Sequence, residues 1–74
     1  MATIGTVMPQ VDGEKLRRLR EARFLSHRDL AREASVSPTT ILNLEANRVE
    51  AQRRTIRKLA RALEVDPAEL VRQE

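Results

Sequence analysis

The sequence predicts an all-α fold, a compact bundle of five short helices. Apolar residues recur at helical spacing in several segments, and no segment after residue 11 alternates with the period of two that is typical of a β-strand. Helix-starting signals, in which Ser or Asp stands just before a short apolar-periodic run, occur at Ser26, Ser37 and Asp66. Only short connections separate these runs, as is usual for helices packed in a bundle.

The composition indicates one small domain. A chain of 74 residues is near the lower size limit for a domain that folds without disulfides or a structural metal ion. It contains no cysteine, which excludes disulfides and thiolate metal sites. Phe24 is the single aromatic residue, so aliphatic side chains must supply the core. There is no apolar run long enough to cross a bilayer and no signal-peptide pattern in the first ten residues. We expect a soluble, cytoplasmic protein that is not associated with a membrane.

The first part of the chain divides into an arm and a helix. Residues 1–11 carry no charge and show no helical period, so we expect a flexible N-terminal arm, with a short strand as the alternative. The folded domain is expected over residues 12–72. Its first helix should begin near Asp12 and run to about Arg23, with three apolar residues on one side: Leu16, Leu19 and Ala22.

The stretch "SHRDLAREASVSPTTILNLE" predicts two helices separated by a tight corner. Ser26 and Asp29 have the spacing of a capping box, in which each side chain accepts a hydrogen bond from the backbone N–H of the other residue. Ser37 precedes Pro38, and proline is favoured at the first helical position because its missing N–H would be unpaired there anyway. The residues expected to face inward are Leu30, Ala31, Ala34, Val36, Ile41 and Leu44.

Two further helices are expected after residue 50. One spans roughly residues 53 to 63, and its apolar stripe consists of Ile56, Leu59, Ala60 and Leu63. The last is indicated by "VDPAEL", in which Asp66 is a cap, Pro67 takes the first turn and Glu69 completes a second box. Leu70 and Val71 should point inward.

Charge is distributed unevenly along the chain. The net charge is only +3, but residues 48–61 contain six basic residues against Glu50, and residues 64–74 contain four acids against Arg72. A basic block beside an acidic tail indicates one side that faces a polyanion, although Arg-rich helices also occur simply as well-solvated surfaces. Arginine outnumbers lysine twelve to two, which suits phosphate recognition or reflects codon usage.

With these helices placed, the chain resembles the helix-turn-helix domain of lambdoid repressors and Cro, also called the xenobiotic-response-element (XRE) family. The resemblance rests on three stretches, "LRRLREARFLSHRDLA", "ASVSPTTILNLEANR" and "TIRKLARALEVDPAEL", which contain four motifs in register and cover about residues 14 to 71. Ser35 and Phe24 stand where the family usually has glycine, and Asn47 follows Ala46 where Asn-Gly is usual. We expect a left-handed backbone at Ser35 and Asn47, and Phe24 as additional apolar cover.

The resemblance implies that the second helix of the pair, about residues 38–46, lies in the major groove of DNA. The residues then expected to read base edges are Pro38, Thr39 and Asn43, since asparagine can bond an adenine edge and a threonine methyl can touch a thymine methyl. Phosphate contacts are expected from helix starts and nearby cations, namely Ser26, His27, Arg28, Ser37, Thr40, Arg48, Arg53 and Arg54. Without the resemblance, Asn43 would be read as an ordinary solvated helix residue.

The resemblance also implies a structural ion pair between Arg20 and Glu45, which would fix the angle of the reading helix; the alternative is two independent surface charges. The sequence gives no support for a catalytic site, because it has no Ser/His/Asp triad, no paired carboxylates in an apolar setting and no Gly-rich phosphate loop. His27 is the only histidine, so we expect no metal site. No cofactor and no small-molecule ligand are expected.

The leading hypothesis is therefore a sequence-specific transcriptional regulator, a repressor that binds double-stranded operator DNA as a homodimer. The resemblance also implies a protein that is encoded by a bacterium or phage and is associated with the nucleoid. One alternative is a protein-interaction module of the same fold, an antitoxin-like or adaptor domain. Another is the DNA-binding segment of a longer regulator. The basic stretch from Arg48 to Arg61 favours DNA over a purely protein partner.

Overall fold

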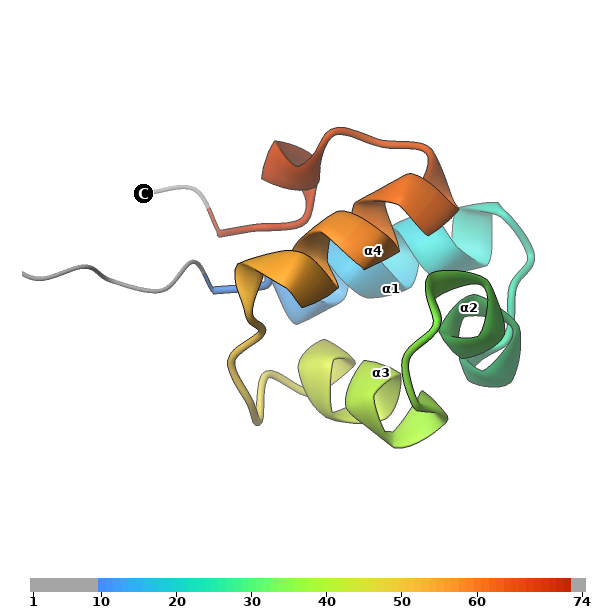
Figure 1. Ribbon diagram of the computed structural model, residues 1–74, viewed down its shortest axis with the longest axis horizontal. Coiled ribbons are helices and arrows are strands. Elements are labelled where there is room, and N and C mark those ends of the chain that lie inside the picture. The colour runs from blue at the N-terminus through green and yellow to red at the C-terminus, as the bar shows by residue number, and fades with distance from the viewer. Residues whose placement is uncertain (1–9, 73–74) are drawn as a thin grey trace, which may run out of the picture.

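The computed structural model describes residues 10–72 of the chain. Four α-helices are followed by a single 3₁₀ turn: α1 (Gly13–Ala22), α2 (His27–Ala34), α3 (Pro38–Glu45), α4 (Arg53–Leu63) and η1 (Pro67–Glu69). In Figure 1, α4 lies in front of α1, with α2 to their right and α3 below them. The contacts of α2 with α3 and α4, and of α1 with α3, hold α3 on one side of the bundle.

Local capping chemistry sets where the first three helices begin. The Asp12 carboxylate accepts hydrogen bonds from two backbone N–H groups in the first turn of α1. At α2 the expected capping box is present, because the Ser26 hydroxyl accepts from the N–H of Asp29 and the Asp29 carboxylate accepts from the N–H of Ser26. At α3 the Ser37 hydroxyl accepts from the N–H of Thr40, and Pro38 takes the first position.

The prediction of a fifth helix is wrong within the described residues. Residues 67–69 form one 3₁₀ turn, in which the Asp66 carboxylate accepts from the N–H of Ala68 and Glu69 does not reach back as in a capping box. The chain leaves this turn to pair with a distant segment. Val71 forms an antiparallel bridge with Val11, the N–H of Asp12 donates to the carbonyl of Leu70, and the N–H of Arg72 donates to the carbonyl of Gln10. This pairing requires an extended backbone, so no helix continues beyond the 3₁₀ turn.

The same pairing brings the end of the expected arm into the fold. Residues 1–9 lie outside the described residues, but Gln10 and Val11 do not: Gln10 is paired as above, and Val11 is only 3% exposed. The folded part therefore includes two residues that the sequence pattern assigns to the arm.

The core is aliphatic, as the composition requires. The largest fully buried side chains come from all four helices and from the segment after η1: Leu16, Leu30, Ile41, Leu44, Leu59, Leu63 and Leu70. Phe24 is not apolar cover, because 93% of its surface is exposed. It lies in the corner between α1 and α2 with a φ of 57°, and its side chain is in solvent, not in the core. Between residues 10 and 72, no helix has both the length and the apolar character needed to cross a membrane.

Candidate nucleic-acid interface

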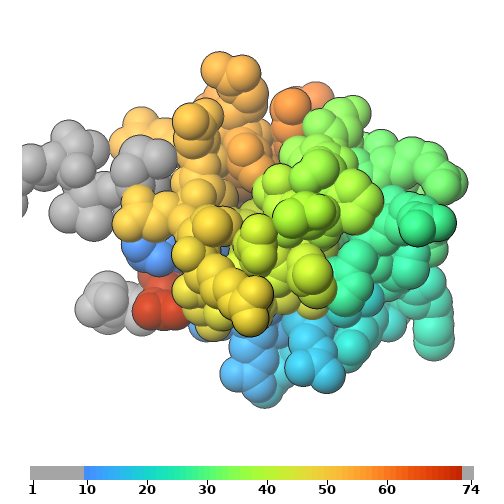
Figure 2. Space-filling model, turned by 90° about the horizontal axis from the view of Figure 1, so that it is seen from below, coloured from blue at the N-terminus to red at the C-terminus, as the bar shows by residue number. Residues whose placement is uncertain are grey.

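α3 presents one side to the core and the other to solvent. Ile41 and Leu44 are buried, whereas Pro38 and Thr39 are exposed and Asn43 is half-buried. Figure 2 looks onto this side of the molecule and shows α3 (yellow-green) across the middle of the face, with the 46–52 segment (yellow) beside it. The three residues expected to read bases therefore belong to the solvent-facing half of a helix that lies on the surface.

A buried ion pair connects α3 to α1. The Arg20 guanidinium binds the Glu45 carboxylate in a bidentate arrangement, with Nε 2.6 Å from Oε2 and Nη2 3.1 Å from Oε1. Both side chains are less than 10% exposed, and Arg20 also donates to the carbonyl of Leu25 at 2.8 Å. The hydrogen bond to Glu45 raises the pKa of Arg20 above its ordinary value. The pair ties the C-terminal end of α3 to α1, in the place that the family resemblance implies.

His27 binds the same carboxylate. Its Nε2 lies 3.1 Å from Oε1 of Glu45, and about two fifths of its side chain is exposed. The sequence pattern predicts that His27 faces a phosphate, whereas the structure directs one ring nitrogen to Glu45. Within residues 10–72, the other ring nitrogen, Nδ1, forms no hydrogen bond. His27 thus links the first residue of α2 to the last residue of α3.

A second connection, which sequence reasoning missed, holds the C-terminal end of α3 against the start of α1. A Cβ atom on Gly13 would come within 2.6 Å of the carbonyl oxygen of Leu44, so only glycine fits there without displacing α3. The N–H of Gly13 donates to Oδ1 of Asn47 at 3.0 Å. Asn47 has a φ of 59°, the left-handed conformation expected for it. A glycine in the first turn of a helix, where helix propensity disfavours it, was the available signal.

The N-terminus of α2 is largely occupied by its own cap. The Ser26 hydroxyl accepts from the N–H of Asp29, and the Asp29 carboxylate accepts from the N–H of Ser26; this backbone hydrogen bond lowers the pKa of Asp29 below its usual range. A carboxylate in the first turn makes this end less attractive to a phosphate than the sequence pattern indicated. Arg28, the next expected phosphate contact, is exposed beside it.

At the start of α3 the two expected phosphate contacts bind each other. The Ser37 and Thr40 hydroxyls are 2.9 Å apart, and Ser37 also accepts from the N–H of Thr40. Ser37 is exposed and Thr40 is half-buried. Each hydroxyl can still form a further hydrogen bond, since an O–H group has one donor and two acceptor positions.

The N-terminus of α4 differs from the other three. Gln52 is the N-cap residue, and its side chain makes no capping hydrogen bond, so the first-turn N–H groups receive no side-chain partner there. Arg53 and Arg54 are the first two residues of the helix, and both are exposed, as is Arg48 in the preceding segment. Uncapped N–H groups with cations beside them form an end that favours an anion.

These features place two kinds of exposed group on and next to α3: short side chains and cations. Short polar and apolar side chains lie along α3, and exposed cations follow it in the segment before α4 and in the first turn of α4. Short side chains can reach base edges only if their helix approaches closely, and cations beside them suit a phosphate backbone.

Comparison with known proteins agrees with this geometry. Residues 13–73 match the family described as "Helix-turn-helix domain". No curated protein sequence matches significantly. Among solved structures, the restriction-modification controller protein C.AhdI from Aeromonas hydrophila is 33% identical, with a TM-score of 0.75 over 77% of this chain and 86% of that one.

Two other structures are similar. The clp gene regulator ClgR from Corynebacterium glutamicum is 30% identical, with a TM-score of 0.73 over 77% of this chain and 61% of that one. The DNA-binding domain of the P22 C2 repressor, 24% identical, has a TM-score of 0.74 over 84% of this chain and 82% of that one, which shows a shared fold. The chain belongs to the helix-turn-helix family, as a domain of the lambda-repressor-like, XRE type.

Proposed function

We propose that this protein is a sequence-specific transcriptional regulator that represses by occupying an operator in double-stranded DNA. The observation that carries the proposal is the exposed half of α3, held by the buried Arg20–Glu45 pair and followed along the chain by three exposed arginines, Arg48, Arg53 and Arg54. Two of the similar structures are described as a controller protein and a gene regulator, and a third is the DNA-binding domain of a repressor, which supports the same assignment. Binding of this kind is non-covalent and needs no cofactor.

The major groove is the proposed site for α3. Asn43 would bond an adenine edge, while Thr39 and Pro38 would contact a thymine methyl. Arg53 and Arg54, at the uncapped start of α4, would contact the phosphates on one flank together with Arg48. Arg28 and the free nitrogen of His27 would contact the opposite flank, and the hydroxyls of Ser26, Ser37 and Thr40 would add hydrogen bonds to phosphate oxygens.

We further propose that the protein binds DNA as a homodimer. The sequence favours a dimer surface on the last helix and the arm, because Val65, Leu70 and Val71 exceed what a core this small needs. Leu70 is fully buried in the protein's own core, so it is not available. Val65 and Val71 are half-buried, and Val71 lines a shallow groove of about 330 Å³ between α4 and η1 together with Ile56 and Arg53.

Such a dimer would place two copies of α3 about 34 Å apart, one helical turn of DNA. Sedimentation of the protein alone and with operator DNA measures its mass in each state. We expect a two-to-one complex on a palindromic site. A strict one-to-one complex on a non-palindromic site would exclude the homodimer without excluding DNA binding.

A salt titration tests DNA binding itself. The affinity for a random duplex is measured over a range of salt concentrations, and a protein that neutralises phosphates must show log affinity falling steeply and linearly with log salt. If no affinity for DNA is measurable at any salt concentration, the alternative of a protein-interaction module is favoured. In-vitro selection from random duplexes then identifies the operator.

A further inference from the structure

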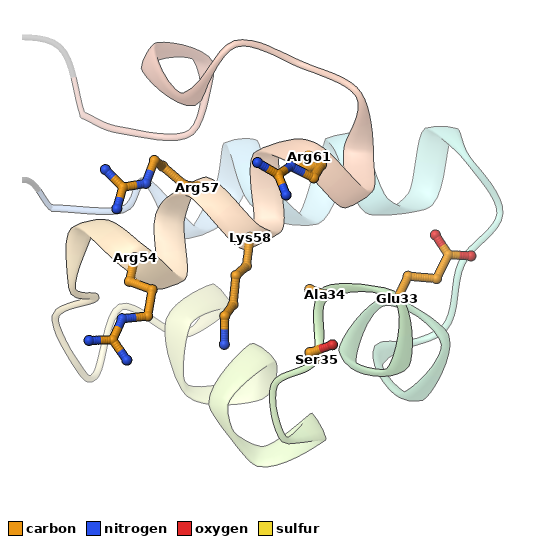
Figure 3. Close-up of a pocket in the computed structure, with 7 residues that line it drawn as sticks. All are labelled: Glu33, Ala34, Ser35, Arg54, Arg57, Lys58 and Arg61. Atoms are coloured by element: carbon orange, nitrogen blue, oxygen red, sulfur yellow. The ribbon is translucent and has the colours of Figure 1, made fainter.

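A cationic groove lies between α4 and the C-terminal end of α2, outside the face that α3 presents. Its volume is about 360 Å³. Figure 3 shows the two sides of the groove: Arg54, Arg57, Lys58 and Arg61 come from α4, while Glu33, Ala34 and Ser35 come from α2 and the corner after it. We refer to it as the α2–α4 groove. Arg54 is at the end nearest the N-terminus of α4, and Lys58 extends toward the α2–α3 corner.

The four cations form one row, because positions 54, 57, 58 and 61 share a face of a helix. Within residues 10–72 none of them has an ion pair or a side-chain hydrogen bond. Like charges at three- and four-residue spacing destabilise a helix, so the row carries charge that only an external anionic group neutralises. The proposed DNA contacts account for Arg54 and leave the role of Lys58 and Arg61 open.

The opposite wall of the α2–α4 groove is negative. Glu33 is exposed there, and its carboxylate has no ion pair within the described part of the chain. The last turn of α2, at Ala34, adds the partial negative charge of its carbonyl groups. A nucleic-acid backbone carries negative charge only, so it has no group that could pair with Glu33. A protein segment can carry both signs, and a groove with one wall of each sign suits such a segment.

We infer that the α2–α4 groove binds a partner protein through an acidic helix. The partner helix would carry carboxylates at positions i, i+3, i+4 and i+7 to match the row on α4, and a lysine or arginine at one end to meet Glu33. Helices commonly bind in grooves formed by other helices and are read at this spacing. Apart from Arg54, no residue that lines the groove is among the proposed DNA contacts, so this binding does not require the DNA-binding proposal to be correct.

The test uses a synthetic helical peptide of about 16 residues with glutamates at those four positions and a terminal lysine. A scrambled peptide of the same composition is its control. Fluorescence anisotropy should show the helical peptide binding at least about tenfold more tightly than the scrambled one. If the two bind equally, or neither binds, the groove has no specificity for an acidic helix and the inference is wrong.

Variants then locate the binding. The pair Lys58→Glu with Arg61→Glu should weaken peptide binding by about tenfold or more, whereas Arg18→Glu with Arg32→Glu, which changes the net charge equally but lies outside the groove, should weaken it less. Thermal melts show that each variant is folded. Arg61→Glu alone, at an exposed position, repeats the test if Lys58→Glu unfolds the domain.

A charge swap tests the negative wall. Glu33→Lys should weaken binding of the original peptide, and replacing the peptide's lysine with glutamate should restore it. DNA affinity is measured for the same variants. If Lys58→Glu with Arg61→Glu lowers DNA affinity and its salt dependence more than Arg18→Glu with Arg32→Glu, the groove contacts phosphates and the inference fails, while the DNA-binding proposal stands.

Discussion

Glu45 joins three elements through one carboxylate. It accepts two hydrogen bonds from Arg20 on α1 and lies 3.1 Å from the His27 ring on α2, while its own backbone ends α3. Because its side chain is only 8% exposed, water does little to stabilise either partner if the other is removed. A small number of buried polar contacts thus set the angle at which α3 leaves the bundle.

At the residue scale we predict that Glu45→Gln lowers the free energy of unfolding by about 3 kcal/mol, because the Arg20 guanidinium is left buried without a counter-charge. Urea unfolding measures the change. Glu21→Gln is the matched control, since Glu21 also approaches Arg20, at 3.9 Å, but is 53% exposed. It should cost less than about 1 kcal/mol. Equal losses for the two variants would mean that the Arg20–Glu45 pair contributes no more than a surface contact.

At the element scale, α3 is fixed at its C-terminal end by the close approach of α1. We predict that Gly13→Ala destabilises the protein by about 1–3 kcal/mol, because its Cβ would press on the backbone carbonyls of α3 and force the two helices apart. Helix propensity alone predicts the opposite sign, since alanine is the better helix former.

Thermal unfolding separates these two expectations for Gly13. Glu14→Ala, at the next and exposed position in the same turn, serves as the control and should change stability by less than about 1 kcal/mol. A Gly13→Ala variant that is as stable as the parent would show that α1 and α3 are not in close contact.

The elements also show which features can be predicted from sequence. The starts of α2 and α3 were predictable because the hydroxyls of Ser26 and Ser37 each accept a hydrogen bond from the N–H group three residues later. The prediction of a fifth helix was wrong because the backbone after Glu69 is extended and pairs with Gln10 and Val11, about sixty residues earlier in the chain. The residues "DPAE", which the sequence pattern assigned to a helix start, form only one capped 3₁₀ turn.

The site was predictable to a similar extent. The Arg20–Glu45 pair is present where the resemblance placed it, whereas the contact between His27 and Glu45 and the contact between Gly13 and Asn47 depend on tertiary packing. No local pattern encodes how two residues 34 positions apart approach each other. The roles of Thr39 and Asn43 in reading bases remain predictions.

At the scale of the whole molecule, charge divides α4 into two parts. Its uncapped start, with Arg53 and Arg54, is the part we assign to DNA, and the rest of the row along the α2–α4 groove, from Arg57 to Arg61, is the part we assign to a protein. We predict that replacing Arg53 and Arg54 with alanine weakens binding to all DNA sequences alike. The slope of log affinity against log salt should fall by about 0.9 for each phosphate that the variant no longer neutralises.

The control for this prediction lies on the same helix. Lys58→Ala with Arg61→Ala removes the same charge and should leave the slope nearly unchanged, because these side chains line the α2–α4 groove. An unchanged slope for the first pair would place the start of α4 off the DNA. Titrations of a random duplex with the parent and both variants provide the comparison.

The central claim is that α3 reads base edges. Pro38 has no N–H and the other side chains are short, so readout depends on Thr39 and Asn43 at close approach. The most direct measurement is a competition assay of the parent, Asn43→Ala and Thr39→Ala against every single-base variant of the selected operator.

We predict that Asn43→Ala loses about 1–3 kcal/mol of binding free energy on the best operator, confined to one A·T position, with non-specific affinity barely changed. Thr39→Ala should show a weaker loss at a neighbouring position. If Asn43→Ala instead weakens binding to all sequences equally, Asn43 contacts the DNA backbone, and α3 does not read the operator with the face proposed.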